Sequence, residues 1–451
     1  MKLDCFVKGG MVVSPYGTYR GNIGIKGEEI VLIDTYDGHH DAEEVIDAKG
    51  LHVIPGIIDT HTHIGWPDWP LEQDLGPTTK AAAAGGVTTI MHYVMAPESL
   101  VEGIREQKSA FERGAYIDGG FHGMIFSEKN IEEIPTVSEM GVRSFKFFLP
   151  YKGPEAVPPA IGIDDGIVYQ GFKQIARLDP PGLALFHAEN IEIFFQLKDQ
   201  FLKEGLNDVD WHDTRPNFVE IESIRKIVFY ARETGCPIYV VHMSVREGPY
   251  EVARARAEGV NITAETCPQY LTLTKRAHRV LGKVNPPLRD TKDNEALWEG
   301  LRTGMVECLG SDHAPCATKH KQEFWSAVVG FAGVQTTLPV MLSEGVNKGR
   351  ITLEKLVEIA CYNNARKFGL LPKKGTLQVG SDADLVLIDL DKEFSVRASD
   401  LYHISDFTPF EGMTIKGVPV LTMVRGKVVM KENKIIGEPR GKFVPAYGIQ
   451  K

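Results

Sequence analysis

The stretch that decides the fold is residues 53–63, which read Val53-Ile54-Pro55-Gly56-Ile57-Ile58-Asp59-Thr60-His61-Thr62-His63. An apolar run typical of a buried strand is followed by histidines at positions i and i+2. Side chains alternate between the two faces of a strand, so both imidazoles lie on one face, where together they can bind a divalent metal ion. The competing interpretation is two polar residues in a loop, which is the commoner fate of an isolated His-x-His pair.

Short apolar runs alternate with helix-like segments between about Val53 and Leu371. The runs lie at residues 88–94, 144–149, 183–187 and 238–242. This alternation predicts βα units, and a segment of roughly 320 residues built from them fits a (β/α)8, TIM-like barrel with its chemistry at the C-terminal ends of the strands. A doubly wound open sheet is the alternative. No glycine-rich dinucleotide or phosphate motif follows an early strand, so a nucleotide cofactor is not expected.

Both ends of the chain are rich in β-type sequence. Glycines punctuate such runs at residues 6–13 and 22–33, and residues 380–389 and 418–429 resemble a buried strand and a hairpin. We therefore expect the two ends to form a small β-sandwich domain beside the barrel. The predicted divisions are residues 1–52 for the first part of the sandwich, 53–372 for the barrel, and 373–451 for the second part and the C-terminal tail.

The composition excludes several kinds of partner. The 451 residues include 50 Lys+Arg and 60 Asp+Glu, a net charge of −10, so no broad cationic surface is expected to bind nucleic acid or an anionic membrane. No run of about 18 apolar residues occurs, and residues 1–5 lack the segments of a signal peptide. The six cysteines are scattered and suggest no disulfide framework. We therefore expect a cytoplasmic protein that neither spans a membrane nor is secreted.

Three further polar residues come at the ends of strand-like runs. His187 and His242 each end such a run, and Asp312 follows a third. Each of them alone is most simply a structural residue, but together with the first histidine pair they would meet at one rim of a barrel. Asp312 is the candidate general base, because a carboxylate there can bind metal or accept a proton from bound water. Its alternative role is to cap the following helix.

Lys146 is the only basic residue of the run Phe145-Lys146-Phe147-Phe148-Leu149. Burying an ammonium group without compensation is costly, so this lysine either extends to solvent or serves a function. The periodicity of the run leaves both possibilities open.

Taken together, these residues resemble the amidohydrolase superfamily, and more closely its cyclic-amidohydrolase branch of hydantoinases, dihydropyrimidinases and allantoinases. The matches follow one another in order over nearly the whole chain. They are PGIIDTHTH at 55–63, AAAAGGVTT at 81–89, FK at 145–146, HAEN at 187–190, ETCPQYL at 265–271, NPPLR at 285–289, SDH at 311–313, KGTL at 374–377 and GSDADL at 380–385.

The resemblance implies a centre of two divalent metal ions, usually zinc, with manganese and cobalt as alternatives. It implies that Lys146 is carboxylated by CO2 and that its carbamate bridges the ions. By this analogy one ion is bound by His61, His63 and Asp312, and the other by His187 and His242. A bridging hydroxide would then attack the ring amide carbonyl, and Asp312 would carry its proton to the departing ring nitrogen.

Hydantoins and related cyclic ureides or imides are the small-molecule substrates we expect. His63 is followed by Ile64 and Gly65, not by the arginine that dihydroorotases commonly have two residues on. Tyr151, within Leu149-Pro150-Tyr151-Lys152-Gly153, resembles the tyrosine with which hydantoinases and dihydropyrimidinases donate to the developing oxyanion. The likeness also places Asn285 and the backbone near Val329 at the imide edge of the substrate.

Two alternatives to a hydantoinase remain. The segments at 265–271 and 286–290 fit an allantoinase equally well, with dihydropyrimidinase next. A non-catalytic scaffold of the dihydropyrimidinase type is the rival of another class, although it would be expected to have lost metal ligands. Trp66 and Trp69 predict an aromatic-tolerant gate over the substrate, with a packed loop or a subunit contact as the other interpretation. By the family likeness we expect a homotetramer or a dimer.

Overall fold

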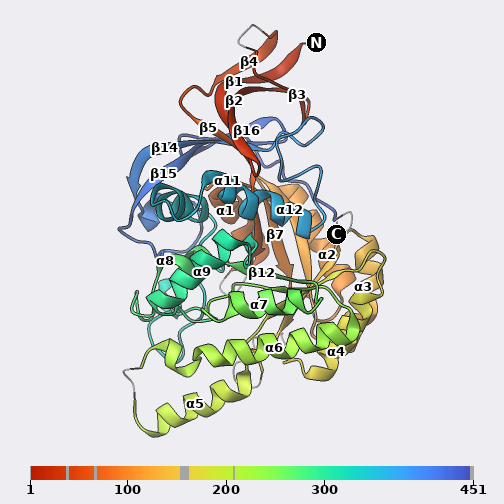
Figure 1. Cartoon of the computed structure of the whole chain (residues 1–451), viewed down its shortest axis with the longest axis vertical. Coiled ribbons are helices and arrows are strands. Elements are labelled where there is room, and N and C mark those ends of the chain that lie inside the picture. Colours follow the sequence, from red (N-terminus) through yellow and green to blue (C-terminus); the bar gives the residue numbers. More distant parts are fainter. Residues whose placement is uncertain (1, 37–39, 66–68, 153–161, 207–208, 447–451) are drawn as a thin grey trace.

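The structure is a computed structural model that describes residues 2–36, 40–65, 69–152, 162–206 and 209–446. Within these ranges no helix is both long and apolar enough to cross a membrane. The chain builds two sheets: one from its two ends and one from its middle (Figure 1).

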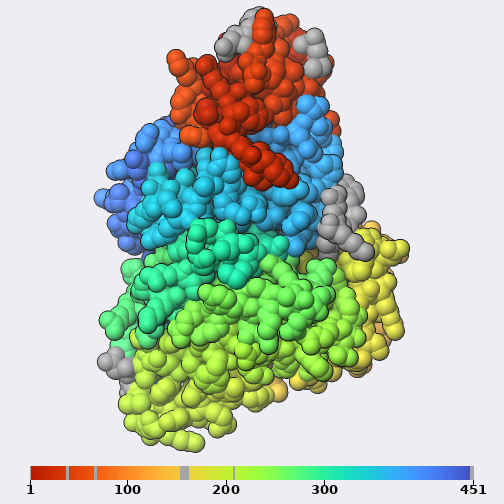
Figure 2. All heavy atoms as spheres, viewed as in Figure 1, coloured from red at the N-terminus to blue at the C-terminus, as the bar shows by residue number. Residues whose placement is uncertain are grey.

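The two chain ends meet in a nine-stranded sheet. Strands β5 and β14 join the two halves as antiparallel neighbours, with Leu385 opposite Pro55 and Leu387 opposite Val53. Figure 2 shows the N-terminal and C-terminal segments packed together at one end of the molecule. The strands are β1 (Leu3–Ser14), β2 (Gly17–Lys26), β3 (Glu29–Asp34), β4 (Ala42–Asp47), β5 (His52–Pro55), β14 (Leu385–Ser395), β15 (Thr414–Val424), β16 (Lys427–Lys431) and β17 (Lys434–Ile435).

The middle of the chain forms eight parallel strands in the order β13-β12-β11-β10-β9-β8-β7-β6. Their apolar runs are buried on both faces, as expected of a parallel sheet wrapped in helices. The strands are β6 (Ile57–Thr62), β7 (Val87–Val94), β8 (Asp118–Met124), β9 (Ser144–Phe148), β10 (Leu183–His187), β11 (Ile238–Val240), β12 (Ile262–Thr266) and β13 (Cys308–Leu309).

Helices alternate with these strands along the chain and cover the outside of the barrel (Figure 1). Several begin at a residue whose side chain caps the first turn, such as Ser99, Ser127, Asp164 and Asn190. The helices are α1 (Leu71–Ala84), α2 (Leu100–Gly114), α3 (Glu128–Glu139), α4 (Asp165–Ala176), α5 (Ile191–Lys203), α6 (Asn217–Thr234), α7 (Gly248–Ala257), α8 (Pro268–Thr272), α9 (Thr291–Thr303), α10 (Thr337–Val340), α11 (Leu353–Val357) and α12 (Asn363–Lys367), with short 3₁₀ segments η2 (Trp211–Thr214), η3 (Thr318–His320) and η6 (Ala398–Asp400) and π-helical segments η4 (Met341–Asn347) and η5 (Glu358–Tyr362).

The barrel closes at its C-terminal rim, where the ends of the first and last strands meet. His63 donates its backbone N–H to the carbonyl of His313 (2.7 Å), and His313 donates to the carbonyl of His61 (3.2 Å). Thr62 and His313 form a parallel bridge at the same place. The predicted fold class, a (β/α)8 barrel with a small β domain from both chain ends, is confirmed. The predicted residue boundaries of the domains stay predictions.

A buried ion cluster fastens the barrel to the β domain. Lys374 Nζ lies 2.6 Å from Asp118 Oδ2, at the start of β8, and 2.7 Å from Asp384 Oδ2, just before β14. Arg425 Nε is 3.0 Å from the same oxygen of Asp118. These side chains are at most 5% exposed, so the charges compensate one another out of water.

Replacing Lys374 with Met should destabilise the protein by about 3–5 kcal/mol, because it leaves Asp118 and Asp384 buried without their shared cation. The measurement is the urea unfolding midpoint, and Lys392→Met is the control. Lys392 pairs with Glu432 at a site where both side chains are about half exposed, so its loss should change stability by less than about 1 kcal/mol. Equal effects of the two substitutions would contradict the role given to the cluster.

Candidate metal centre

The six residues predicted as metal ligands come from five strand ends of the barrel. His61 lies in β6 and His63 directly after it, Lys146 lies in β9, His187 ends β10, and His242 and Asp312 follow β11 and β13 by two and three residues. Parallel strands bring their carboxyl ends to one rim, so residues far apart in sequence become neighbours.

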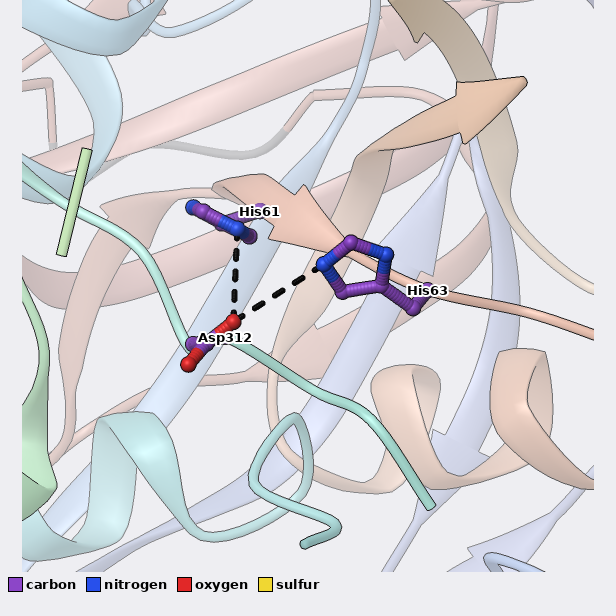
Figure 3. A group of neighbouring side chains, drawn as sticks. All are labelled: His61, His63 and Asp312. Carbon is purple, nitrogen blue, oxygen red and sulfur yellow. Dashed lines mark ion pairs between the residues drawn. The ribbon is translucent and has the colours of Figure 1, made fainter. Parts of the chain in front are cut away.

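His61, His63 and Asp312 form one group. His61 Nε2 is 3.3 Å and His63 Nε2 is 3.9 Å from Asp312 Oδ1, and Figure 3 shows both rings directed at the carboxylate. One ligand atom from each of the three lies within 4.8 Å of the others. Two imidazole nitrogens and a carboxylate oxygen at this separation suit a single divalent ion.

His187 and His242 form a second group beside the first. His187 Nδ1 lies 3.1 Å from His242 Nε2, and the ring of His242 is 5.1 Å from that of His61. Glu189 Oε2 is 2.7 Å from the other nitrogen of His187, so it orients the ring and leaves Nδ1 facing the centre. Burial alone would raise the pKa of Glu189, but Arg215 and His187 bring it below its usual value.

Lys146 is completely buried among these groups. Its Nζ has no hydrogen-bond partner among the described residues and lies 4.7 Å and 4.6 Å from the ring centres of Tyr93 and Phe148. Burial lowers the pKa of Lys146 to about 7, against the opposite effect of the Asp312 and Glu265 carboxylates. The side chain therefore does not extend to solvent.

The four predicted histidine ligands are uncharged, which suits the binding of cations. Burial lowers the pKa of the four histidines, so that each ring is neutral and keeps a lone pair for binding metal. Burial also raises the pKa of Asp312 well above its ordinary range, although Lys146 opposes this. His242 and Asp312 have φ angles of 39° and 53°, a left-handed conformation that non-glycine residues adopt mainly where the surroundings demand it.

A cavity opens beside the two groups. Its wall includes His63, His187, His242 and Asp312, together with Tyr151, Asn285 and Val329, the three residues predicted to bind substrate. Much of the remaining wall is apolar, from Leu71, Met95, Met124, Phe126, Phe148 and Ile163. Of the predicted gate, Trp66 lies outside the described residues, and Trp69 is partly buried and does not line the described part of the cavity.

Glu265 is the residue that sequence reasoning passed over. His61 Nδ1 lies 2.9 Å from Glu265 Oε1, which also accepts from the backbone N–H of His242 at 3.1 Å. Its second oxygen accepts from the hydroxyls of Thr60 and Tyr239. Glu265 thus holds two predicted ligands at once and leaves Nε2 of His61 facing Asp312. The only signal in the sequence was a carboxylate near the end of a buried strand, Ile262–Thr266.

The site has counterparts among known proteins. A model of the amidohydrolase family matches residues 231–429. An L-hydantoinase of Paenarthrobacter aurescens is 35% identical, over 98% of each chain, and an allantoinase of Bacillus licheniformis is 34% identical, over 99% of this chain and 100% of its own. The crystal structure of a dihydropyrimidinase from Brevibacillus agri matches with a TM-score of 0.92 at 32% identity and covers 99% of each chain.

The fold and the histidine-lined rim define an enzyme of the (β/α)8-barrel class, built like barrels that act at the C-terminal ends of their strands. Since relatives above 30% identity span almost its full length, the chain belongs to the amidohydrolase family, in its cyclic-amidohydrolase branch. The family resemblance drawn from the sequence is thereby confirmed.

Glu265→Gln should weaken binding of Zn²⁺ about 10- to 100-fold, because the amide keeps the shape of Glu265 but holds the His61 ring less firmly. Titration against a competing chelator measures this affinity. Glu220→Gln is the matched control, since Glu220 is also buried but contacts Ser244 and Arg289 and none of the predicted ligands. Unchanged zinc affinity in Glu265→Gln would refute the orienting role.

Proposed function

We propose that this protein is a hydrolase that opens the cyclic amide bond of hydantoins or related cyclic ureides and imides. The proposal includes two divalent ions, zinc first and manganese or cobalt as alternatives, and a Lys146 carboxylated by CO2. The observation that carries it is the convergence of all six predicted ligand positions on one rim of the barrel. Full-length similarity to proteins named hydantoinase supports the substrate class.

The residues present fit two ions. His61, His63 and Asp312 would hold one, and His187 and His242 the other. Nε2 of His61 and the amine of Lys146 are both buried and make no hydrogen bond with the described residues. An unpaired buried donor or acceptor is destabilising by itself, so the imidazole nitrogen is best explained as a ligand atom and the amine as the site of carboxylation.

Carboxylation would resolve the position of Lys146. With a pKa near 7, part of the amine is uncharged at neutral pH and able to add to CO2. The product is an anion with oxygen ligands instead of a buried cation. A carbamate on Lys146 would then face both histidine groups, which supports its assignment to both ions.

The chain itself supplies the proton transfers and the binding contacts. When bound, the ions would acidify water and polarise the scissile carbonyl. Asp312, whose buried carboxyl readily takes up a proton, would accept one from the attacking water and pass it to the leaving ring nitrogen. Tyr151 would donate its hydroxyl to the oxygen on which negative charge develops. Asn285 and the backbone at Val329 would hold the imide edge of the ring.

An allantoinase is the second candidate, because an allantoinase is 34% identical over nearly the whole length. A non-catalytic scaffold is the rival of another class, and the complete set of ligand positions speaks against it. Assembly as a homotetramer or dimer belongs to the same proposal, supported by the family resemblance. A cytoplasmic location, supported by the scattered cysteines, and a gate formed by Trp66 and Trp69, supported by their position soon after His63, also belong to it.

A panel of hydantoin, 5-benzylhydantoin, dihydrouracil, allantoin and dihydroorotate should show the highest kcat/KM for a hydantoin and the lowest for dihydroorotate. Dihydroorotate carries a carboxylate, and the described wall of the cavity contains no lysine or arginine to bind it. Ring opening is followed by product analysis after loading with zinc, cobalt or manganese and bicarbonate. Preference for allantoin would favour the second candidate, and inertness under every loading condition would favour the scaffold.

Lys146→Ala should lower kcat/KM for the preferred ring at least about 100-fold, a loss of roughly 3 kcal/mol in transition-state stabilisation. A short carboxylic acid such as acetate should restore part of the activity, since it fits the vacated space and supplies the missing oxygen ligand. The same acid should have no such effect on His187→Ala, which lacks a nitrogen ligand instead. Full activity of Lys146→Ala without added acid would exclude a functional carbamate.

A further inference from the structure

Trp211 lies behind the wall of the cavity. It belongs to η2, is 6% exposed, and packs with Ile191 and Phe194 in a small apolar cluster. Its indole Nε1 donates to Asn285 Oδ1 at 2.8 Å. Trp211 is not among the residues that line the described cavity, whereas Asn285 is. The hydrogen bond to Asn285 therefore connects Trp211 to the wall of the cavity.

The chemistry of indole fixes which way the amide of Asn285 points. An indole N–H can only donate, so the amide atom that it contacts has to be the oxygen. The NH2 group of Asn285 is then left to donate elsewhere. Tyr151 lines the same cavity. Burial raises the pKa of Tyr151, and the Asn285 side chain, as a donor to the phenol oxygen, acts in the opposite direction.

Lys283 holds the indole in place. Its Nζ lies 4.0 Å from the centre of the Trp211 ring and donates to the backbone carbonyls of Phe324 and Trp325 at 2.9 and 3.2 Å. The carbonyl of Lys283 in turn accepts from the backbone N–H of Gly330 at 3.0 Å. Lys283 thus joins the segments that carry Asn285 and Val329, and Trp211 contacts both Lys283 and Asn285.

We propose that Trp211 is a positioning residue for the ring-binding wall. Its N–H binds the oxygen of the Asn285 amide and so directs the NH2 group towards the cavity. This wall therefore offers a hydrogen-bond donor, which selects a carbonyl oxygen of the substrate over a ring N–H. The inference rests on the function proposed above and adds the residue that sets the polarity of the imide-binding edge.

Trp211→Phe tests this with little change in shape, because it removes the indole N–H but keeps an aromatic ring beside Lys283. We expect KM for the preferred ring to rise about tenfold, with kcat changed less than threefold, since Asn285 loses its fixed orientation in ground and transition state alike. Trp298→Phe is the matched control: Trp298 is 7% exposed, donates its indole N–H to the carbonyl of Leu271 at 2.9 Å and lies under Arg350. Equal effects on KM from both variants would overturn the proposal.

A double-mutant cycle locates the effect in Asn285. Asn285→Asp keeps an acceptor for Trp211 but loses the NH2 donor, so it should raise KM by itself. Adding Trp211→Phe to Asn285→Asp should raise KM by less than threefold more. A full further tenfold rise would mean that Trp211 does not act through Asn285, and would overturn the proposal.

A second readout does not need activity and separates this inference from the proposed function. Hydrogen exchange of the Trp211 indole, assigned by its absence in Trp211→Phe, should be slow in the wild type and in Asn285→Asp. It should be at least tenfold faster in Asn285→Ala, with the Trp298 indole unchanged as an internal reference. If the wild type opens no ring, the proposed function fails while this test still decides whether Trp211 holds Asn285. Unchanged exchange in Asn285→Ala would overturn the positioning role.

Discussion

The hydrogen bonds between the ends of β6 and the segment after β13 are the interaction on which the rest of the structure depends. His63 and His313 donate to carbonyls across this seam, and the same few residues close the barrel and bring Asp312 beside His61 and His63. The hydrogen bonds that close the barrel therefore also hold the group of His61, His63 and Asp312 together. A loosened seam would open the sheet and separate the carboxylate from both imidazoles, so at this rim the stability of the fold and the geometry of the site are coupled.

The buried polar groups of the candidate centre are electrostatically unfavourable by themselves. Three buried histidines and the partly buried His63 lie near a lysine amine that has no hydrogen-bond partner among the described residues, next to a carboxyl group whose pKa burial raises. Such a set is unfavourable in a protein interior without further charges, because buried polar atoms need partners. In the proposed function, divalent cations and a carbamate would supply those partners and so stabilise these buried groups. The left-handed backbone at His242 and Asp312 indicates the same demand, since it aims both side chains inward.

The sequence predicted the features that are local in origin. Apolar runs of strand length and a polar residue at the end of several of them are visible in single segments, so the barrel and five ligand candidates could be named. Lys146, which lies inside its run, became a ligand candidate only through the family resemblance. The family resemblance then supplied the grouping of the ligands. The contacts that hold those residues could not be found in this way. Glu265 meets His61 and Lys374 meets Asp118 only through tertiary structure, and a buried carboxylate or lysine in one segment carries no sign of its partner.

Relatives named hydantoinase, allantoinase and dihydropyrimidinase are about equally similar to this chain, so overall similarity does not select one of these activities. In the proposed function, the walls of the cavity would select the substrate. Apolar side chains make up much of the lining, and its polar wall includes Asn285. The polar wall is held from behind by Trp211 and Lys283, which never touch the cavity in the described structure. Because a donor and an acceptor can exchange places when an amide turns over, such hidden contacts decide which edge of a ring is bound. In the proposed function, specificity therefore depends on Trp211, which contacts the lining residue Asn285, as well as on the residues that line the site.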